Sequence, residues 1–270
     1  MKEKLIHEDF FTRIGKDDLF CRWIKHGSKS NYPVLIFLHE GLGSIPQWKD
    51  FPDEIALRTG LDVLLYERTG YGQSSPMTEQ REIDYLHIEA EQLSTLVDHL
   101  AIPSYILIGH SEGGTIALIH AGENPAGLVK VITLSANVFH ESKITKGILK
   151  VRQKFCEDNS KLRKALEGFH KNKTSQIFFA WSDTWTADWF GKFNVEESIL
   201  RIKIGILAMH GNEDEYTSPE QIKRIEKCTK GPIRTFILND CGHHPHFQQR
   251  EKVLKYIVQF LSDVAPSKDR

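Results

Sequence analysis

The sequence predicts an α/β fold with a mostly parallel sheet, because short apolar runs alternate with segments of helical periodicity. Residues 33–39, 62–66 and 106–108 are apolar runs typical of strands that are buried on both faces. Helical patterns follow the first two runs, at residues 48–59 and 84–100. Functional loops in such a sheet lie beyond the carboxyl ends of the strands, so the chemistry is expected there.

The rest of the chain continues this alternation, with one interruption. Apolar and polar residues alternate on both sides of the break at residues 15–18, which predicts an N-terminal hairpin. Further strands are expected near residues 128–135, 204–209 and 233–238, with helices after Pro219 and at residues 247–261. Residues 137–200 are rich in lysine and aromatic residues and show helical patterns without a buried strand. We therefore expect a core of residues 1–136 and 201–270, with residues 137–200 inserted as a helical cap over the strand ends.

Composition excludes several classes of function. The 270 residues carry a net charge of −1, which gives no general reason to expect nucleic-acid or membrane binding. The four cysteines are far apart and form no CxxC pair, which favours free thiols in a reducing compartment. The first nine residues lack the apolar core of a signal peptide, and no apolar run is long enough to span a bilayer. A soluble, cytoplasmic protein is the expectation.

The most informative stretch is the sequence Gly109-His110-Ser111-Glu112-Gly113, which follows an apolar run and precedes an alanine-rich helical segment. A Gly-x-Ser-x-Gly turn between a strand and a helix holds its serine in strained geometry, with the hydroxyl projecting above the sheet. The helix N-terminus that follows favours negative charge developing nearby. Ser111 is therefore the candidate nucleophile.

A serine nucleophile needs a base, an orienting acid and donors for an oxyanion, and each is available at the end of a predicted strand. His243 follows the last strand and Asp214 follows the one before it, in the order Ser, Asp, His that is expected on an α/β sheet. The backbone N–H groups of Glu112 and Gly41 are the candidate oxyanion donors, with Leu42 as second choice for the latter. The nearby Cys241, His244 and His246 lack zinc-finger spacing, so no metal is expected.

These motifs together resemble the α/β-hydrolase superfamily over nearly the whole chain. The matching pieces, in order, are residues 39–44, 68–74, 109–114, 211–214 and 242–243. The resemblance implies an eight-stranded core, a helical cap and no cofactor, and it is nearest to small bacterial carboxylesterases and proline-iminopeptidase-like hydrolases. The chain departs from the family pattern at Glu40, where glycine is usual, and at Glu67, where aspartate is usual. For Glu40 two roles are open, a salt bridge with Arg68 or a side chain that points away.

The substrate is less well defined than the chemistry. Leu42, Phe139, Trp181, Trp185 and His244 are the expected pocket residues, and the aromatic side chains favour an apolar acyl or aryl group. Between residues 141 and 175, ten Lys and Arg face four acidic residues, a local charge of 10 − 4 = +6. Such a basic segment is either a solvated helix face or a docking surface for an acidic acyl carrier protein, as in similar carrier-protein esterases.

The leading prediction is a serine hydrolase that cleaves a carboxylic ester through an acyl-enzyme on Ser111. One alternative is an aminopeptidase of the proline-iminopeptidase type, which needs an acidic group for the amine of the substrate. The candidates in the cap are Asp183, Asp188, Glu196 and Glu197. Another alternative is a ligand receptor with the same fold and no hydrolysis.

Overall fold

The computed structural model describes residues 4–26 and 32–266, and its core is a mixed, mostly parallel sheet. Within these residues the sheet has eight strands, in the order β1-β2-β4-β3-β5-β6-β7-β8. The strands are β1 Ile6–Ile14, β2 Asp17–Lys25, β3 Val34–Leu38, β4 Val63–Tyr66, β5 Tyr105–His110, β6 Leu128–Leu134, β7 Gly205–Gly211 and β8 Ile233–Leu238. β2 pairs antiparallel with β1 and β4, and all other neighbours are parallel. The predicted fold class and N-terminal hairpin are confirmed.

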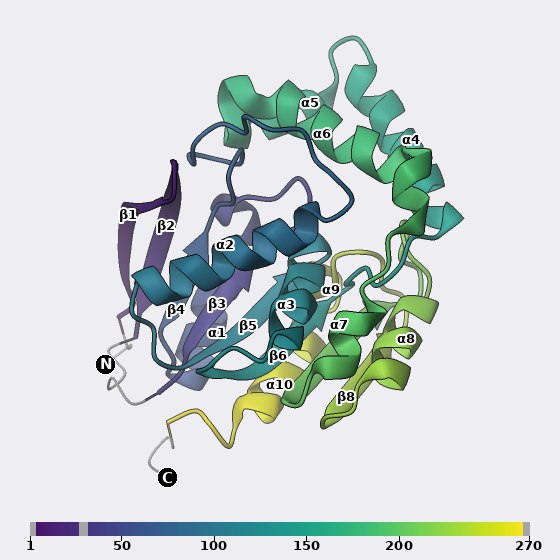
Figure 1. Cartoon of the computed structure of the whole chain (residues 1–270). Coiled ribbons are helices and arrows are strands. Elements are labelled where there is room, and N and C mark those ends of the chain that lie inside the picture. Colours follow the sequence, from purple (N-terminus) through teal and green to yellow (C-terminus); the bar gives the residue numbers. More distant parts are fainter. Residues whose placement is uncertain (1–3, 27–31, 267–270) are drawn as a thin grey trace.

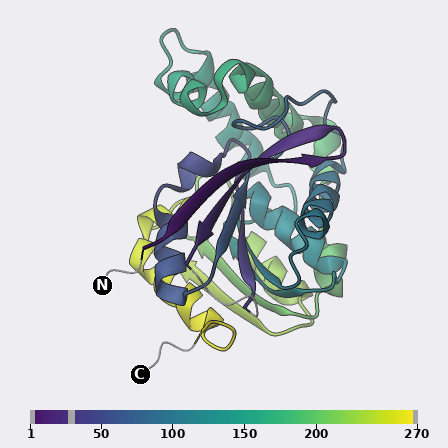
Figure 2. The same cartoon turned by 90° about the vertical axis from the view of Figure 1, so that its left-hand side faces the viewer.

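Helices cover both faces of the sheet (Figures 1 and 2). One face carries α2 Tyr85–His99, α3 Glu112–Gly122, α7 Glu196–Arg201 and α8 Glu220–Cys228, and the other carries α1 Phe51–Thr59 and α10 Arg250–Leu261. The strands show why both faces are buried. In β3, Ile36 and Leu38 pack with the α2 and α3 residues, whereas Leu35 and Phe37 pack with those of α1 and α10. Successive side chains of a strand point to opposite faces, so an unbroken apolar run requires two helical layers.

The helix after the central strand is the most deeply enclosed. Every residue of α3 is buried, and α7 lies directly against it. A Cβ atom added at Gly122 would stand only 2.5 Å from the carbonyl oxygen of Ser198 in α7, so only glycine allows the two helices this close. This packing fixes the carboxyl end of α3 against α7, while Ser111 and Glu112 stand at the opposite end of the helix.

The segment between β6 and β7 forms the helices that rise above the carboxyl ends of the strands (Figure 1). They are α4 Ser142–Cys156, α5 Lys161–His170, η2 Lys171–Lys173, α6 Thr174–Thr186 and η3 Asp188–Lys192. Their own core includes the rings of Phe155 and Phe178, stacked with centroids 3.6 Å apart. We call α4 to η3 the cap. The last helix of the segment, α7, packs on the core instead.

The C-terminal part differs from the sequence expectation in one respect. The single helix expected at residues 247–261 is two helices, α9 Pro245–Gln248 and α10, separated at Gln249. The side-chain amide of Gln249 donates to the carbonyl oxygens of Asn239 and Asp240, at a backbone conformation (φ −127°, ψ 41°) that is not helical. Near the N-terminus, the short η1 helix, Ile45–Trp48, is also separate from α1, which follows it.

None of the helices formed by the described residues combines the length and apolar character needed to cross a bilayer.

Candidate active site

Ser111 lies in a tight turn between β5 and α3. Its backbone has φ 52° and ψ −121°, a strained conformation for a residue with a side chain. A Cβ atom at Gly109 would stand 2.2 Å from the carbonyl oxygen of Gly113, and one at Gly113 would stand 2.0 Å from that of Leu38. Both glycines are therefore required by close backbone contacts around the serine, as the sequence pattern predicts.

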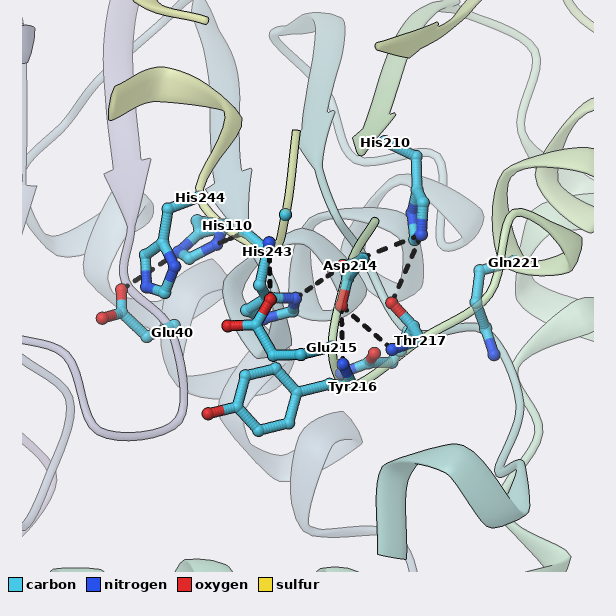
Figure 3. A network of polar contacts seen from close by, with 12 residues as sticks. Glu40, His110, His210, Asp214, Glu215, Tyr216, Thr217, Gln221, His243 and His244 are labelled. Carbon is cyan, nitrogen blue, oxygen red and sulfur yellow. Dashed lines mark hydrogen bonds and ion pairs between the residues drawn. The ribbon is translucent and has the colours of Figure 1, made fainter. Parts of the chain in front are cut away.

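His243 and Asp214 meet at the ends of neighbouring strands (Figure 3). The Nδ1 atom of His243 lies 2.7 Å from Oδ2 of Asp214, and the other oxygen, Oδ1, accepts from the backbone N–H groups of Tyr216 and Thr217 at 2.8 and 3.0 Å. These bonds fix the carboxylate. Since Nδ1 of the histidine donates to an acceptor-only group, Nε2 remains free to accept a proton.

The charges and burial around His243 favour a role as a general base. Burial disfavours the charged imidazole of His243, but the charge of Asp214 and its hydrogen bond outweigh burial, so the pKa of His243 is raised above its usual value. For Asp214 burial opposes ionisation, while His243 and the backbone donors hold its pKa below the usual range. The carboxylate is thus charged and the imidazole is poised to accept a proton.

Ser111 and His243 open onto the same cavity, of about 110 Å³, beneath the cap. Of the predicted pocket residues, Leu42, Trp181, Trp185 and His244 line it, and so does Gly41. Phe139 is a correction: it is outside the described lining, because its backbone bridges to Asn194 and its ring lies under the guanidinium group of Arg224. The sequence analysis did not place five lining residues in the pocket, which are Glu40, Asn137, Ile144, Ile148 and Tyr216.

The sequence contained only weak indications that these missed residues line the pocket. Ile144 and Ile148 are four residues apart on α4 and share one face of it, a pattern that equally fits cap core. Tyr216 stands two residues after Asp214, and its ring lies against His243 with centroids 4.8 Å apart. Proximity to the predicted acid was the one clue to this tyrosine.

The residues that carry the two candidate oxyanion donors, Gly41 and Glu112, are neighbours in space. A Cβ atom at Gly41 would be 2.8 Å from Oε1 of Glu112 and 2.5 Å from the indole of Trp181, so the glycine backbone passes directly beside the start of α3. The carbonyl of Gly41 accepts from the hydroxyl of Tyr71 at 2.8 Å, which fixes this loop. Backbone N–H groups of a loop and of a helix N-terminus are the usual components of an oxyanion hole.

Glu112 also has a structural role that the sequence did not indicate. Its buried carboxylate accepts from Arg68, Tyr85 and the indole of Trp185, at 3.0, 2.9 and 2.8 Å. Burial opposes its ionisation, but Arg81 and Arg68 lower its pKa, so the carboxylate is charged. The residue after the candidate nucleophile is thereby bound to the cap through Trp185.

The structure shows the contacts of Glu40 and Glu67, the two residues that depart from the family pattern. The carboxylate of Glu40 makes no salt bridge with Arg68, because that guanidinium binds Glu112 and reaches only the backbone carbonyl of Glu40. Instead, Oε2 of Glu40 lies 3.2 Å from Nδ1 of His110 (Figure 3). Glu67 accepts from the backbone N–H groups of Ile45 and Gln73, so the longer acid still fixes its loop.

Glu40, His110 and His244 also bring three possible metal-ligand atoms within 4.8 Å of one another. Ligand atoms of a tetrahedral zinc site stand about 3.3 Å apart, which follows from Zn–N and Zn–O bonds near 2.0–2.1 Å. Both ring nitrogens of His110 are already within hydrogen-bond distance of protein acceptors. The cluster therefore fits an internal hydrogen-bond network better than a metal site.

Comparison with known proteins agrees with this architecture. Residues 33–205 match the family model described as the alpha/beta hydrolase fold. The chain belongs to the α/β-hydrolase family. It is 26% identical over 209 residues to the human serine hydrolase BPHL, covering 74% of this chain and 69% of that protein. It is 32% identical over 110 residues to a proline iminopeptidase of Lactobacillus helveticus, a match that spans 40% of this chain and only 37% of the relative.

Solved structures show the same fold at low identity. The 2-hydroxy-6-oxo-6-phenylhexa-2,4-dienoate hydrolase of Rhodococcus superposes with a TM-score of 0.78 at 15% identity, covering 96% of this chain and 99% of that chain. Proline iminopeptidase of Mycobacterium smegmatis superposes with a TM-score of 0.69 at 17% identity, covering 95% and 98%. The family and these relatives support a hydrolase.

Proposed function

We propose that this protein is a serine hydrolase that cleaves a carboxylic ester through an acyl-enzyme on Ser111. The observation that carries the proposal is a strained serine and an aspartate-bound histidine that open onto one cavity. Backbone strain of this kind accumulates at functional sites.

In the proposed mechanism, His243 Nε2 takes the hydroxyl proton of Ser111 as Oγ attacks the carbonyl carbon of the ester. The N–H groups of Gly41 and Glu112 bind the oxyanion of the tetrahedral intermediate. As the C–O bond breaks, His243 gives the proton to the leaving alcohol. Water, deprotonated by the same imidazole, then attacks the acyl-enzyme, releasing the acid and restoring the serine.

The direct test compares the wild type and Ser111→Ala with a p-nitrophenyl short-chain ester. We expect turnover by the wild type and a loss of at least about a thousandfold in the variant, because only the contributions of the oxyanion hole and binding remain. Circular dichroism establishes that both proteins are folded. Full activity of a folded Ser111→Ala protein would contradict the proposal.

A second candidate is a prolyl aminopeptidase, which the sequence relatives favour. An aminopeptidase needs a carboxylate for the amine of the substrate, and Glu40 is the one carboxylate among the described lining of the cavity. Asp183 is bound by Arg152 and Glu196 by Arg224, so these two cap acids are engaged elsewhere. A panel of prolyl amides and matched alkyl esters separates the two functions: we expect a higher kcat/KM for the esters, and the reverse order supports the peptidase.

We also propose that the basic cap receives an acidic acyl carrier protein. The structure divides the ten basic residues into two groups. Lys143, Arg152, Arg163 and Lys173 contact cap or core groups, whereas Lys146, Lys150, Lys154, Lys161, Lys164 and Lys171 are exposed. Three of the exposed lysines, at 146, 150 and 154, follow one another at four-residue spacing along α4. A one-sided row of charge can steer an oppositely charged partner.

The carrier proposal is tested with the triple variant Lys146→Glu, Lys150→Glu, Lys154→Glu. We expect kcat/KM to fall at least about tenfold for an acyl ester on a carrier protein, with small esters unaffected, and the loss to shrink at high salt. A control variant changes the cap charge in the opposite direction, by replacing the exposed acids Glu157 and Asp158 with Lys. Equal effects on both kinds of substrate would contradict docking.

The third candidate, a receptor without hydrolysis, predicts a serine that does not react. A fluorophosphonate probe decides this point, because it labels only an activated serine.

A further inference from the structure

The ring of His110 connects three loops of the candidate site. His110 is the last residue of β5 and directly precedes Ser111. Its Nε2 atom lies 2.7 Å from the backbone carbonyl oxygen of His243, and its Nδ1 atom lies 3.2 Å from Oε2 of Glu40. Figure 3 shows the ring of His110 between Glu40 and His243. The side chain of His110 is fully buried, so water does not replace these partners.

The chemistry of the two partners defines the protons on this ring. A backbone carbonyl only accepts, so Nε2 of His110 carries a hydrogen. Glu40 is ionised and also only accepts: burial opposes its charge, but the hydrogen bond and charge of His110 and the nearby His244 lower its pKa below the usual range. The Nδ1 atom of His110 therefore faces a carboxylate that only accepts, and the two groups form a part-buried polar pair.

We propose that Glu40 and His110 are a positioning pair that holds the loop of His243 against the oxyanion loop. This inference rests on the proposed serine-hydrolase function. Glu40 stands one residue before the oxyanion donor Gly41, and His110 one residue before the nucleophile. The pair thus connects donor, nucleophile and base through one ring, without itself touching the reacting atoms. It also explains a carboxylate at position 40, where a glycine would leave Nδ1 of His110 without a partner.

The pair acts on His243 in two ways. It fixes the backbone of the histidine through its carbonyl oxygen, and the negative charge of Glu40 favours the protonated imidazole. Several titratable groups surround His243, and they are Glu40, His110, His210, Asp214, Glu215, Tyr216 and His244. The ring of His110 also faces His246. Glu40 makes no hydrogen bond to the imidazole of His243, so its charge can be removed without touching the contact between His243 and Asp214.

The test uses Glu40→Gln, which keeps the size of the side chain and removes its charge, together with His110→Asn and the double variant. We expect Glu40→Gln to lower kcat at least about fivefold, and to lower the pKa seen in kcat/KM by about half a unit. In the His110→Asn background the same change should lower kcat little further, because the connection is already broken, whereas the shift of the pKa should remain, because the charge of Glu40 acts on His243 directly. Glu123→Gln, which removes a surface carboxylate at the other end of α3, is the control and should change neither quantity.

Three outcomes decide the proposal. A non-additive loss with the pH shift supports it. Additive losses, or an unchanged pH profile in Glu40→Gln, would overturn it, because a merely structural contact does not move the titration of His243. If Glu40→Gln does not fold, Glu40→Asp replaces it, and the same non-additivity with His110→Asn is required. An inactive wild type would instead contradict the proposed function itself.

Discussion

Asp214 illustrates how single residues define the site. Its carboxylate accepts two backbone hydrogen bonds and one from His243, and it has almost no exposed surface. The orientation of the acid is therefore set before substrate binds, which is a requirement for an orienting group. The neighbouring Glu213 and Glu215 lack this set of contacts: Glu213 is exposed, and Glu215 accepts from the backbone N–H of His243.

The first prediction concerns this contact. In Asp214→Asn we expect kcat to fall about ten-thousandfold, because an amide can present a donor to Nδ1 and stabilise the wrong tautomer of His243. The pKa seen in kcat/KM should also fall, since the charge of Asp214 and its hydrogen bond are the main causes that raise the pKa of His243. A pH series of kcat/KM measures both effects. Glu213→Gln is the matched control, and an Asp214→Asn protein with the activity of that control would rule out the assigned role.

At the residue scale the sequence was informative about motifs and uninformative about side-chain directions. The Gly-x-Ser-x-Gly pattern predicted a turn whose strain and close contacts the structure shows, and Asp214 and His243 do meet. Their catalytic roles stay predictions. Glu40 was not predictable, because its direction depends on the ring of His110, which comes from another strand 70 residues away. Phe139 was misplaced because an aromatic residue near a cap fits core and pocket equally.

At the scale of elements, the cap is held to the core at defined points. His170, at the end of α5, accepts from the backbone N–H of Gly72 at 3.0 Å and donates to the carbonyl of Leu42 at 3.0 Å. Burial lowers the pKa of His170, so the ring is neutral and can make both bonds. Leu42 lies next to the oxyanion donor Gly41, so the position of the cap and the geometry of the oxyanion loop are connected.

The second prediction follows from this connection. His170→Leu removes both hydrogen bonds, so hydrogen exchange should become faster in α5 and around residue 42, and kcat/KM should fall about tenfold. Hydrogen-exchange mass spectrometry and ester kinetics measure these effects. The exposed neighbour provides the control, Lys171→Gln, which should leave both unchanged. Unaltered exchange in a folded His170→Leu protein would show that the cap is held by other contacts.

Element boundaries were predictable where periodicity and capping residues coincide. α1 ends at Thr59 and is followed by Gly60 with φ 71°, the left-handed cap that glycine provides. The break between α9 and α10 was not predictable, because it depends on the contacts of Gln249 with carbonyl groups of a preceding loop. Local patterns contain no information on such tertiary hydrogen bonds.

At the scale of the whole molecule, the interior holds several neutral histidines. His39, His120, His210 and His246 are buried, and burial lowers the pKa of each. The unfolded chain exposes these rings, and they bind protons below about pH 6.5. Because the unfolded state then binds more protons than the folded state, acidification from pH 7.5 to 5 lowers the free energy of unfolding.

The third prediction isolates one of these rings. His120 bonds Tyr105 and Ser94, and burial lowers its pKa to about 4. At pH 5 this shift costs about 2 kcal/mol of stability, and at pH 7.5 almost nothing. In His120→Gln the difference in unfolding free energy between pH 7.5 and 5 should therefore shrink by about that amount, as measured by urea titration. His99→Gln, at a less buried position on α2, is the control; an equal shrinkage in both variants would contradict the assignment.

The layered architecture as a whole was the most predictable feature. Unbroken apolar runs required helices on both faces, and the structure has them. The shape of the cavity was not predictable, because its lining comes from the turn after β5, the oxyanion loop, the cap and the loops after β6, β7 and β8 together. Which residues of so many segments face one space is decided by the packing of the cap.

The central claim, that Ser111 is an activated nucleophile, is tested most directly by covalent labelling. Wild-type protein is treated with a fluorophosphonate probe, and the modified peptide is sequenced by mass spectrometry. We predict one equivalent of label on Ser111, no label in Ser111→Ala, and a strongly reduced rate of labelling in His243→Ala. A wild-type protein that remains unlabelled, or that is labelled equally fast without His243, would contradict the account.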